Sequence, residues 1–362
     1  MGVGRFVYTP ILPLMQAQAG MSAQLGSAVA SANYFGYLVG AIVASLVPRW
    51  ARSVLVLRVS LVVLTLTLAG MPLRHSAALW LGLRGIAGVA SALSFVVASN
   101  ATLAGLRGHA SHRLGWVYGG IGVGIALSGL LILAVRTSWS EAWWVSAVVT
   151  VPLAVVAWRL PASPAVIRAD TPAAGRRVRA RTWFGTLLVS YVLEGAGYII
   201  AGTFLVAAID RTGPDLLGSS AWVLVGIAAV PSCAAWVAWS RRWSRSSLLL
   251  LALVVQAIGI ALPVLSTSVA AAIVGAVVFG GTFVGITALA LAAGSELQMP
   301  RAAAVLTSGY ATGQVLGPLG VTPFLDHGYH TALLVAAVIV LIAAVAVALP
   351  QARYFRTAQE MG

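Results

Sequence analysis

The sequence predicts an all-α membrane protein made of two parallel six-helix bundles, and three observations support this. Hydrophobic residues make up 60% of the 362 residues and charged residues only 8%. A soluble domain carries about 25% charged residues, so no soluble fold of this length can bury so much apolar surface. The other two observations are a series of twelve apolar segments and a repeat that relates the two halves of the chain.

The apolar segments follow one another along almost the whole chain. Most of them reach the roughly 20 residues that a helix needs to cross the hydrocarbon layer, so we expect twelve membrane-spanning helices. The expected spans are 1–18, 24–47, 53–72, 77–105, 113–135, 140–159, 182–208, 218–240, 246–265, 269–293, 302–325 and 329–349.

A short cluster occurs twice, once between each of two pairs of apolar segments. The cluster Arg49-Trp50-Ala51-Arg52-Ser53 returns 193 residues later as Arg242-Trp243-Ser244-Arg245-Ser246. Parallel repeats in a membrane protein indicate two bundles around a central site, which is transporter architecture. We therefore expect one bundle over 1–159, a second bundle with a short tail over 182–362, and a basic cytoplasmic linker over 160–181.

The same offset also relates several glycines of the two halves. The matches are Gly2-Val3-Gly4 with Gly195-Ala196-Gly197, Gly88 with Gly281, Gly120 with Gly313, and Gly124 with Gly317. Glycine is common in this chain, so a single glycine match is weak evidence, but several features in one register indicate two copies of one unit in the same order.

The distribution of arginine predicts the orientation. The chain has a net charge of +14 and no lysine; with the N-terminus inside, the inner loops hold 16 of the 22 arginines and the outer loops three. The positive-inside rule then places both termini in the cytoplasm. Because these arginines lie in short loops between apolar segments, they predict contact with membrane lipid and argue against a nucleic-acid partner.

The first segment is shorter than a membrane-spanning helix. The run from Gly2 to Ala17 would extend about 24 Å, against about 30 Å of hydrocarbon. In the second half, the 13 residues of 182–194 precede the matching Gly195, whereas only Met1 precedes Gly2. We expect a first helix truncated at its N-terminus, with the true start upstream; the alternative is a signal-peptidase site at Ala17-Gln18-Ala19.

Ionisable side chains inside the expected spans are the main candidates for function. Arg5 is expected near mid-membrane, where it would bind a substrate anion or pair with Glu194; alternatively it extends to the cytoplasmic surface. Arg84 begins the run Arg84-Gly85-x-x-Gly88, whose glycines let a neighbouring helix bury it. This arginine either serves the site or is tied structurally to backbone carbonyls.

Glu194 is the only acid in the interior of an expected span. A carboxyl group near mid-membrane can load and release a proton during transport, so Glu194 is the expected proton-linked group. The alternatives are a charge pair with Arg5 and a protonated acid bonded to a neighbouring helix. Tyr198 lies one turn later on the same face and occupies the position equivalent to Arg5.

Neutral polar side chains within the spans either line a cavity or form hydrogen bonds between helices. The candidates for substrate binding are Tyr8, Asn33, Tyr34 and Gln314, within a larger set that also contains Tyr37, Tyr118, Gln256 and Tyr310.

The sequence offers no catalytic constellation, because it lacks a Ser-His-Asp set, a paired carboxylate site and a phosphate loop. The five histidines lie in or next to loops, without a strong metal-ligand pattern. The single cysteine, Cys233, is expected to be a small core residue. We therefore expect no enzyme activity, no cofactor and no metal.

Several motifs resemble those of the major facilitator superfamily. The run Arg84-Gly85-x-x-Gly88 resembles its fourth-helix arginine motif, and the two basic clusters lie where its loop motif lies, although they lack the usual Asp and Gly. The run Gly120-x-Gly122-x-Gly124 resembles its glycine-rich antiporter motif without the proline. The resemblance implies a 6+6 bundle but leaves antiport open.

A closer resemblance is to the YbfB/YjiJ-like branch of that superfamily. It rests on GVGRFVYTPILPLM (2–15), SANYFGY (31–37), GYIIAGTFL (197–205), FGGTFVGI (279–286) and GQVLGP (313–318). The resemblance implies a secondary transporter of small molecules. With the repeat and Glu194, we expect a monomer in the bacterial cytoplasmic membrane that works by alternating access and is coupled to protons. The resemblance names no substrate. The alternative function is a membrane sensor or scaffold that does not transport.

Overall fold

The computed structural model describes residues 2–105, 112–135, 138–160, 177–211, 216–297 and 302–359, and within these ranges its regular structure is helical. The elements are α1 (Gly2–Phe6), α2 (Tyr8–Ala19), α3 (Ala23–Leu46), η1 (Trp50–Arg52), α4 (Val54–Gly70), α5 (Ala77–Gly105), α6 (His112–Ala134), α7 (Trp139–Ala157), α8 (Arg177–Asp210), α9 (Leu217–Trp239), α10 (Arg245–Leu265), α11 (Val269–Glu296), α12 (Ala302–Val321), η3 (Thr322–His327) and α13 (Tyr329–Gln359).

These helices coincide with the twelve expected segments, which confirms the all-α fold. The first segment is divided at Val7 into α1 and α2, and the eleventh continues from α12 into η3. Among the described residues, eight helices are long and apolar enough to cross a membrane, and two further apolar helices, Val54–Gly70 and Tyr118–Ala134, are shorter. Most of the expected linker lies outside the described residues, so the division at 160–181 stays a prediction.

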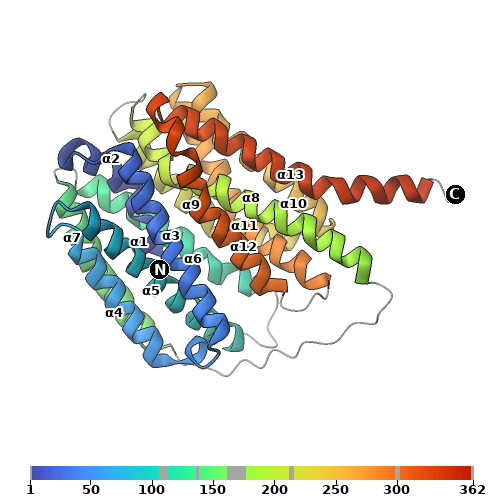
Figure 1. Ribbon diagram of the computed structural model, residues 1–362, viewed down its shortest axis with the longest axis horizontal. Coiled ribbons are helices and arrows are strands. Elements are labelled where there is room, and N and C mark those ends of the chain that lie inside the picture. The colour runs from blue at the N-terminus through green and yellow to red at the C-terminus, as the bar shows by residue number, and fades with distance from the viewer. Residues whose placement is uncertain are drawn as a thin grey trace.

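The helices of the first and second halves occupy different sides of the molecule. Figure 1 shows α3, α4, α5 and α7 in blue and teal on the left, and α8 to α13 in green to red on the right. Helix α5 packs on α3 and α4, whereas α8 packs on α12 and α13, and α10 packs on α11 and α13. Two long contacts cross between the halves, one between α6 and α9 and the other between α3 and α12.

The crossing between α6 and α9 depends on glycines that let the two backbones approach. A Cβ atom on Gly122 would lie 2.6 Å from the carbonyl oxygen of Gly226, and one on Gly226 would overlap the backbone of Ala126. Small residues at helix contacts are the usual way in which membrane helices pack closely. The glycine-rich run of α6 is therefore a packing surface against the opposite half.

One pair of glycines that the repeat relates makes the same contact in the two halves. A Cβ on Gly124 of α6 would overlap Gly2 of α1, and a Cβ on Gly317 of α12 would lie 2.6 Å from the carbonyl oxygen of Ala196 in α8. Ala196 follows Gly195, the residue that the repeat matches with Gly2. Each glycine thus brings the first and fifth helices of its own half together.

The match between Gly88 and Gly281 does not extend to the structure. A Cβ on Gly88 would overlap the carbonyl oxygen of Asn33, whereas Gly281 has no neighbour within 4 Å. In α11 it is Gly280 that contacts the neighbouring helix, at the carbonyl oxygen of Val225. The sequence match of Gly88 with Gly281 therefore does not correspond to the same packing contact.

The repeated arginine cluster forms the junction between one helix and the next. In the first copy the side chain of Ser53 accepts a hydrogen bond from the backbone of Val56 at the start of α4. In the second copy Ser244 accepts one from Ser247 at the start of α10. Serine in this position satisfies one of the free N–H groups of a helix start. Each cluster therefore contains a helix-starting serine beside its positive charge, although at the repeat offset Ser244 matches Ala51 and not Ser53.

Candidate functional site

A cavity of about 590 Å³ lies between the two halves. It extends from Arg5 on α1 and Gln314 on α12 to Val237 near the end of α9 and Ser295 near the end of α11. Helices from both halves contribute to its wall, including α1, α3, α5 and α6 on one side and α8, α9, α11 and α12 on the other. Small-molecule sites have about this volume and combine apolar walls with a few polar groups.

Arg5 is the only charged side chain among the described residues that line this cavity. Its Nη2 atom donates a hydrogen bond of 2.7 Å to Oε1 of Gln314, which lies in the opposite half. The guanidinium carbon also lies 4.2 Å from the ring centre of Tyr37 and 5.4 Å from that of Tyr34. The partners of Arg5 are thus neutral, and among the described residues it forms no ion pair with Glu194.

Four aromatic rings from the second half form part of the opposite wall. Tyr191 and Tyr310 stack with their centres 4.5 Å apart, and Tyr198 stacks on Phe283 at 5.1 Å and on Tyr310 at 6.0 Å. The rings in each pair are tilted by no more than 22°. Stacked rings bury large apolar areas with defined geometry, so this part of the wall is a series of nearly parallel rings.

Arg84 does not line the cavity. Its side chain is only 2% exposed, and its two terminal nitrogens donate hydrogen bonds to the carbonyl oxygens of Gly4 at 3.2 Å and Arg5 at 3.1 Å. These carbonyls lie at the end of α1, where the first segment is interrupted. Of the two interpretations of Arg84 that the sequence allows, the geometry matches the structural one: the guanidinium holds the α1 backbone that carries Arg5.

Three other candidates make contacts between helices and do not line the cavity. The side-chain amide of Asn33 donates a hydrogen bond of 2.9 Å to the carbonyl oxygen of Arg84. The hydroxyl of Tyr8 donates one of 2.9 Å to the carbonyl oxygen of Gly26. The hydroxyl of Tyr34 lies 3.3 Å from that of Thr203 on α8. Hydrogen bonds of this kind hold membrane helices together, which was the alternative role for all neutral polar candidates.

Glu194 does not line the cavity. Its side chain is 1% exposed and lies beside the amide of Gln256 on α10. Among the described residues, neither the two carboxyl oxygens of Glu194 nor the amide atoms of Gln256 have a partner at hydrogen-bond distance. Tyr191 and Tyr198, on the same helix, line the cavity.

The sequence analysis missed several aromatic residues of the wall. Phe6, Phe95, Tyr191 and Phe283 line the cavity, and in the sequence they look like ordinary apolar residues of a span. Tyr191 had one usable signal, because it lies seven residues before Tyr198 and therefore on the same helix face. Cys233, expected to be a core residue, is buried but also lies on this wall.

The end of the cavity beyond Arg5 and Gln314 is closed by hydrogen bonds between the halves. Thr9 donates to the carbonyl oxygen of Gly202 at 2.5 Å, and Ser27 donates to that of Pro318 at 2.5 Å. Gln16 bonds to Tyr329, and Gln24 donates to Asp326 at 2.5 Å. These contacts join α2 and α3 to α8, α12, η3 and α13. The cavity therefore extends toward one end of the bundle only.

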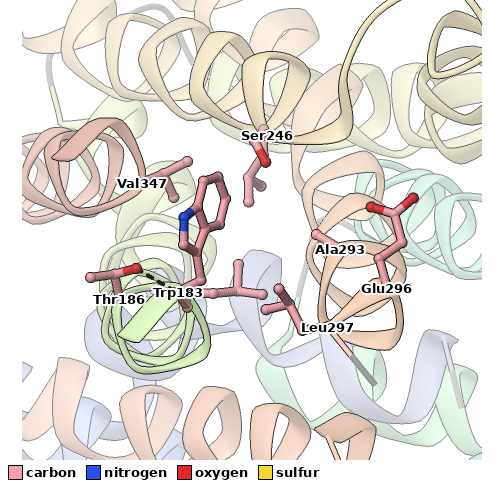
Figure 2. Close-up of a pocket in the computed structure, with 9 residues that line it drawn as sticks. Trp183, Thr186, Ser246, Ala293, Glu296, Leu297 and Val347 are labelled. Atoms are coloured by element: carbon pink, nitrogen blue, oxygen red, sulfur yellow. Dashed lines mark hydrogen bonds between the residues drawn. The ribbon is translucent and has the colours of Figure 1, made fainter. Parts of the chain in front are cut away.

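A second hollow of about 60 Å³ lies between α8, α10, α11 and α13 (Figure 2). The indole of Trp183 projects into it, and Glu296 lies at its edge. Its volume is far below the 300–1,000 Å³ that is typical of small-molecule sites. The larger cavity is therefore the candidate functional site.

Comparisons with known proteins identify both the fold and the family. Two crystal structures of the nucleoside transporter NupG match the fold, one of a single-site mutant with a TM-score of 0.72 at 12% identity and one with 0.70 at 13%. Each match covers 96% of this chain and 97% of the other. A comparison with curated proteins finds no match.

The family profile described as "Uncharacterised MFS-type transporter YbfB" matches residues 1–348, almost the whole chain. This match confirms the resemblance to the YbfB-like branch and, with the apolar helices, shows a multi-pass membrane protein. The chain belongs to the YbfB-like family of major facilitator transporters.

Proposed function

We propose that the chain is a secondary active transporter that carries a small molecule by alternating access and couples this movement to protons. The observation that carries the proposal is the cavity between the halves, which is closed beyond Arg5 and extends toward the opposite end of the bundle. Alternating access requires a central site that each half can expose in turn. The contacts that close this end are individual hydrogen bonds. A rocking movement of the two halves can break them and let other hydrogen bonds form.

The arginine distribution supports an inward-facing conformation. Val237 and Ser295, at the far end of the cavity, lie within a few residues of the ends of α9 and α11, next to loops that hold Arg241, Arg242 and Arg301. The positive-inside rule assigns such loops to the cytoplasm. We therefore propose a monomer in the bacterial cytoplasmic membrane, with both termini and the open end of the cavity on the cytoplasmic side.

Glu194 is the proposed proton-linked group. It is a buried acid beside the amide of Gln256, with no partner at hydrogen-bond distance among the described residues, and it lies on the helix that carries Tyr191 and Tyr198. An isolated carboxylate in hydrocarbon is costly, so the acid is stable there when it carries a proton. Movement of α8 that admits water would let that proton leave. Arg5, Tyr198 and Gln314 are the proposed substrate contacts.

The test uses everted membrane vesicles that contain the chain and are energised by respiration, with a pH-sensitive dye inside. Carboxylates, sugars, amino acids, nucleosides and lipophilic cations are added in turn. We expect one class to release protons in the wild type but not in Glu194→Gln, because the amide cannot exchange a proton. Glu296→Gln is the matched control, since it neutralises an acid at the exposed end of α11.

Counterflow in liposomes with no proton gradient separates transport from coupling. A substrate that Glu194→Gln exchanges but cannot accumulate supports both parts of the proposal. Full proton-driven accumulation by Glu194→Gln would show that this acid is not the coupling group. If folded wild-type protein carries no member of the panel in either assay, a sensor or scaffold role becomes the better account of the fold.

A further inference from the structure

We propose that the substrates of this cavity are planar aromatic carboxylates, compounds of one or two rings that carry a single negative charge. This proposal rests on the transport function proposed above, and it goes further by naming the chemical class that the site recognises. It combines the unpaired charge of Arg5, the position of Gln314 and the flat wall of stacked rings.

The charge of the cavity favours an anion. Arg5 is the only charged residue among its described lining residues, and its side chain is 6% exposed. The partners that the structure gives its guanidinium are an amide and aromatic rings. A buried cation without a counter-ion is unfavourable in a membrane, and a bound carboxylate supplies the missing charge.

The nearby charged groups do not cancel this effect. Arg84 adds a second positive charge behind Arg5, where backbone carbonyls hold it. The acid in this part of the molecule, Glu194, is not among the residues that line the cavity and makes no ion pair with Arg5. The field inside the cavity is therefore positive, and an organic cation would meet repulsion from Arg5.

Arg5 and Gln314 also present their donors side by side. A guanidinium has only donors, so Gln314 must turn its Oε1 atom toward Arg5, as the bond of 2.7 Å shows. The NH₂ group of Gln314 is then directed away from Arg5. A carboxylate has two acceptor oxygens, and it can take one hydrogen bond from the guanidinium and a second from this NH₂ group.

The aromatic wall selects a flat ring. Tyr191, Tyr198, Phe283 and Tyr310 form stacks whose planes differ by only 16° to 22°. A planar ring can extend such a stack, whereas a puckered ring contacts it poorly. Aromatic walls also attract cations, but the rings closest to the charge, Tyr37, Tyr34 and Phe6, already contact the guanidinium of Arg5.

The size and the polarity of the cavity narrow the class further. A volume of about 590 Å³ holds one or two rings with space for water. Sugars are disfavoured, because most of their hydroxyl groups would lie against rings and aliphatic side chains such as Val284 and Leu291 without a hydrogen-bond partner. These features together describe an aromatic acid.

Calorimetric titration of the purified protein in lipid nanodiscs tests the proposal without relying on transport. The probes are benzoate, 2-naphthoate, its neutral amide 2-naphthamide, the saturated acid decalin-2-carboxylate, and a naphthyl trimethylammonium cation. We expect 2-naphthoate to bind at least about tenfold more tightly than the amide and the saturated acid, and the cation to bind most weakly.

Three variants assign the preference to Arg5. Arg5→Gln should remove the advantage of 2-naphthoate over 2-naphthamide, whereas Arg5→Lys should retain part of it because the charge remains. Arg58→Gln is the matched control, since Arg58 is an arginine of a span whose guanidinium lies 5.2 Å from the ring of Trp158 and does not line the cavity. If Arg5→Gln does not fold, the affinities of the wild-type protein for 2-naphthoate and 2-naphthamide still decide whether the site prefers a carboxylate.

The outcomes distinguish this proposal from the transport function. Three outcomes overturn the proposed class, even if vesicles carry another compound. They are failure of both benzoate and 2-naphthoate to bind, equal binding of 2-naphthoate and 2-naphthamide, and tighter binding of the cation. Selective binding of the aromatic acids without any flux in liposomes supports the class and contradicts transport. Selective binding together with saturable flux supports both.

Discussion

The two halves of the molecule share a scaffold but carry different chemistry. Gly124 and Gly317 make equivalent contacts between the first and fifth helices of their halves. Arg5 and Tyr198, at matching positions of the repeat, both line the cavity. Yet the first half contributes the guanidinium, whereas the second contributes stacked rings and the buried acid Glu194. The repeat therefore sets the geometry, and the substitutions within it create an asymmetric site.

The contact beside the repeated arginine cluster differs in the same way. In the first half, Asn100 of α5 donates to the carbonyl oxygen of Ala51 at 3.0 Å. In the second half, Arg245 forms an ion pair of 2.5 Å with Glu296 at the end of α11 and also donates to the carbonyl oxygen of Ala292. Both contacts join the cluster to the fourth helix of its half. The role is thus retained although the residues that perform it differ.

Gly317→Leu has the largest expected effect, because it disrupts the close contact between the first and fifth helices that both halves share. A side chain there would overlap the α8 backbone at Ala196, and such overpacking should lower the free energy of unfolding by about 3 kcal/mol or more. We expect little folded protein, measured as monodisperse material in size-exclusion chromatography and as the melting temperature.

Two further variants show whether the halves are equivalent. Gly320→Leu is the control, since Gly320 lies on the same helix, is exposed and has no neighbour within 4 Å. Gly124→Leu should be as harmful as Gly317→Leu. If Gly124→Leu instead yields normal amounts of folded protein, the repeat relates the sequences of the two halves but not their packing.

Arg84→Gln has an intermediate expected effect, which is confined to stability. The shorter amide cannot reach both the Gly4 and Arg5 carbonyls, so we expect a loss of about 2 kcal/mol, measured as a lower melting temperature. Once folded, the variant should retain the discrimination between aromatic acid and amide. Loss of that discrimination at an unchanged melting temperature would instead make Arg84 a part of the binding site.

Glu296→Gln has the smallest expected effect. The side chains of the ion pair are 35% exposed at Arg245 and 59% at Glu296, and exposed pairs contribute less than about 1 kcal/mol. The difference in melting temperature from wild type should shrink further in 1 M salt, because ions screen exposed charges. A loss as large as that of Arg84→Gln would mean that this contact stabilises the second half in a way that exposed pairs normally do not.

The sequence was sufficient for the fold because lipid imposes simple requirements. Each span must be an apolar helix of nearly fixed length, so composition and length predict all twelve segments and their order. The sequence match of Gly124 with Gly317 corresponds to the same packing contact in both halves. The match of Gly88 with Gly281 does not, because Gly281 has no neighbour within 4 Å.

The site was predicted only in part, because a residue type does not reveal which way its side chain points. Arg5 and Arg84 are both arginines of apolar spans, and only the folded structure shows that Arg5 lines the cavity while Arg84 holds the backbone behind it. Phe283 is an apolar residue by sequence and becomes part of a binding wall through the stacking of its ring on Tyr198.

The sequence by itself determines the membrane location, the helix order, the parallel repeat and the small set of buried charges. Each of these depends on composition or on spacing along one chain. The pairing of Arg5 with Gln314, the position of Glu194 outside the cavity lining and the closure of one end depend on contacts between residues up to 313 positions apart. Such contacts form only when the two halves pack together, so the tertiary structure alone decides where the charge of the cavity lies.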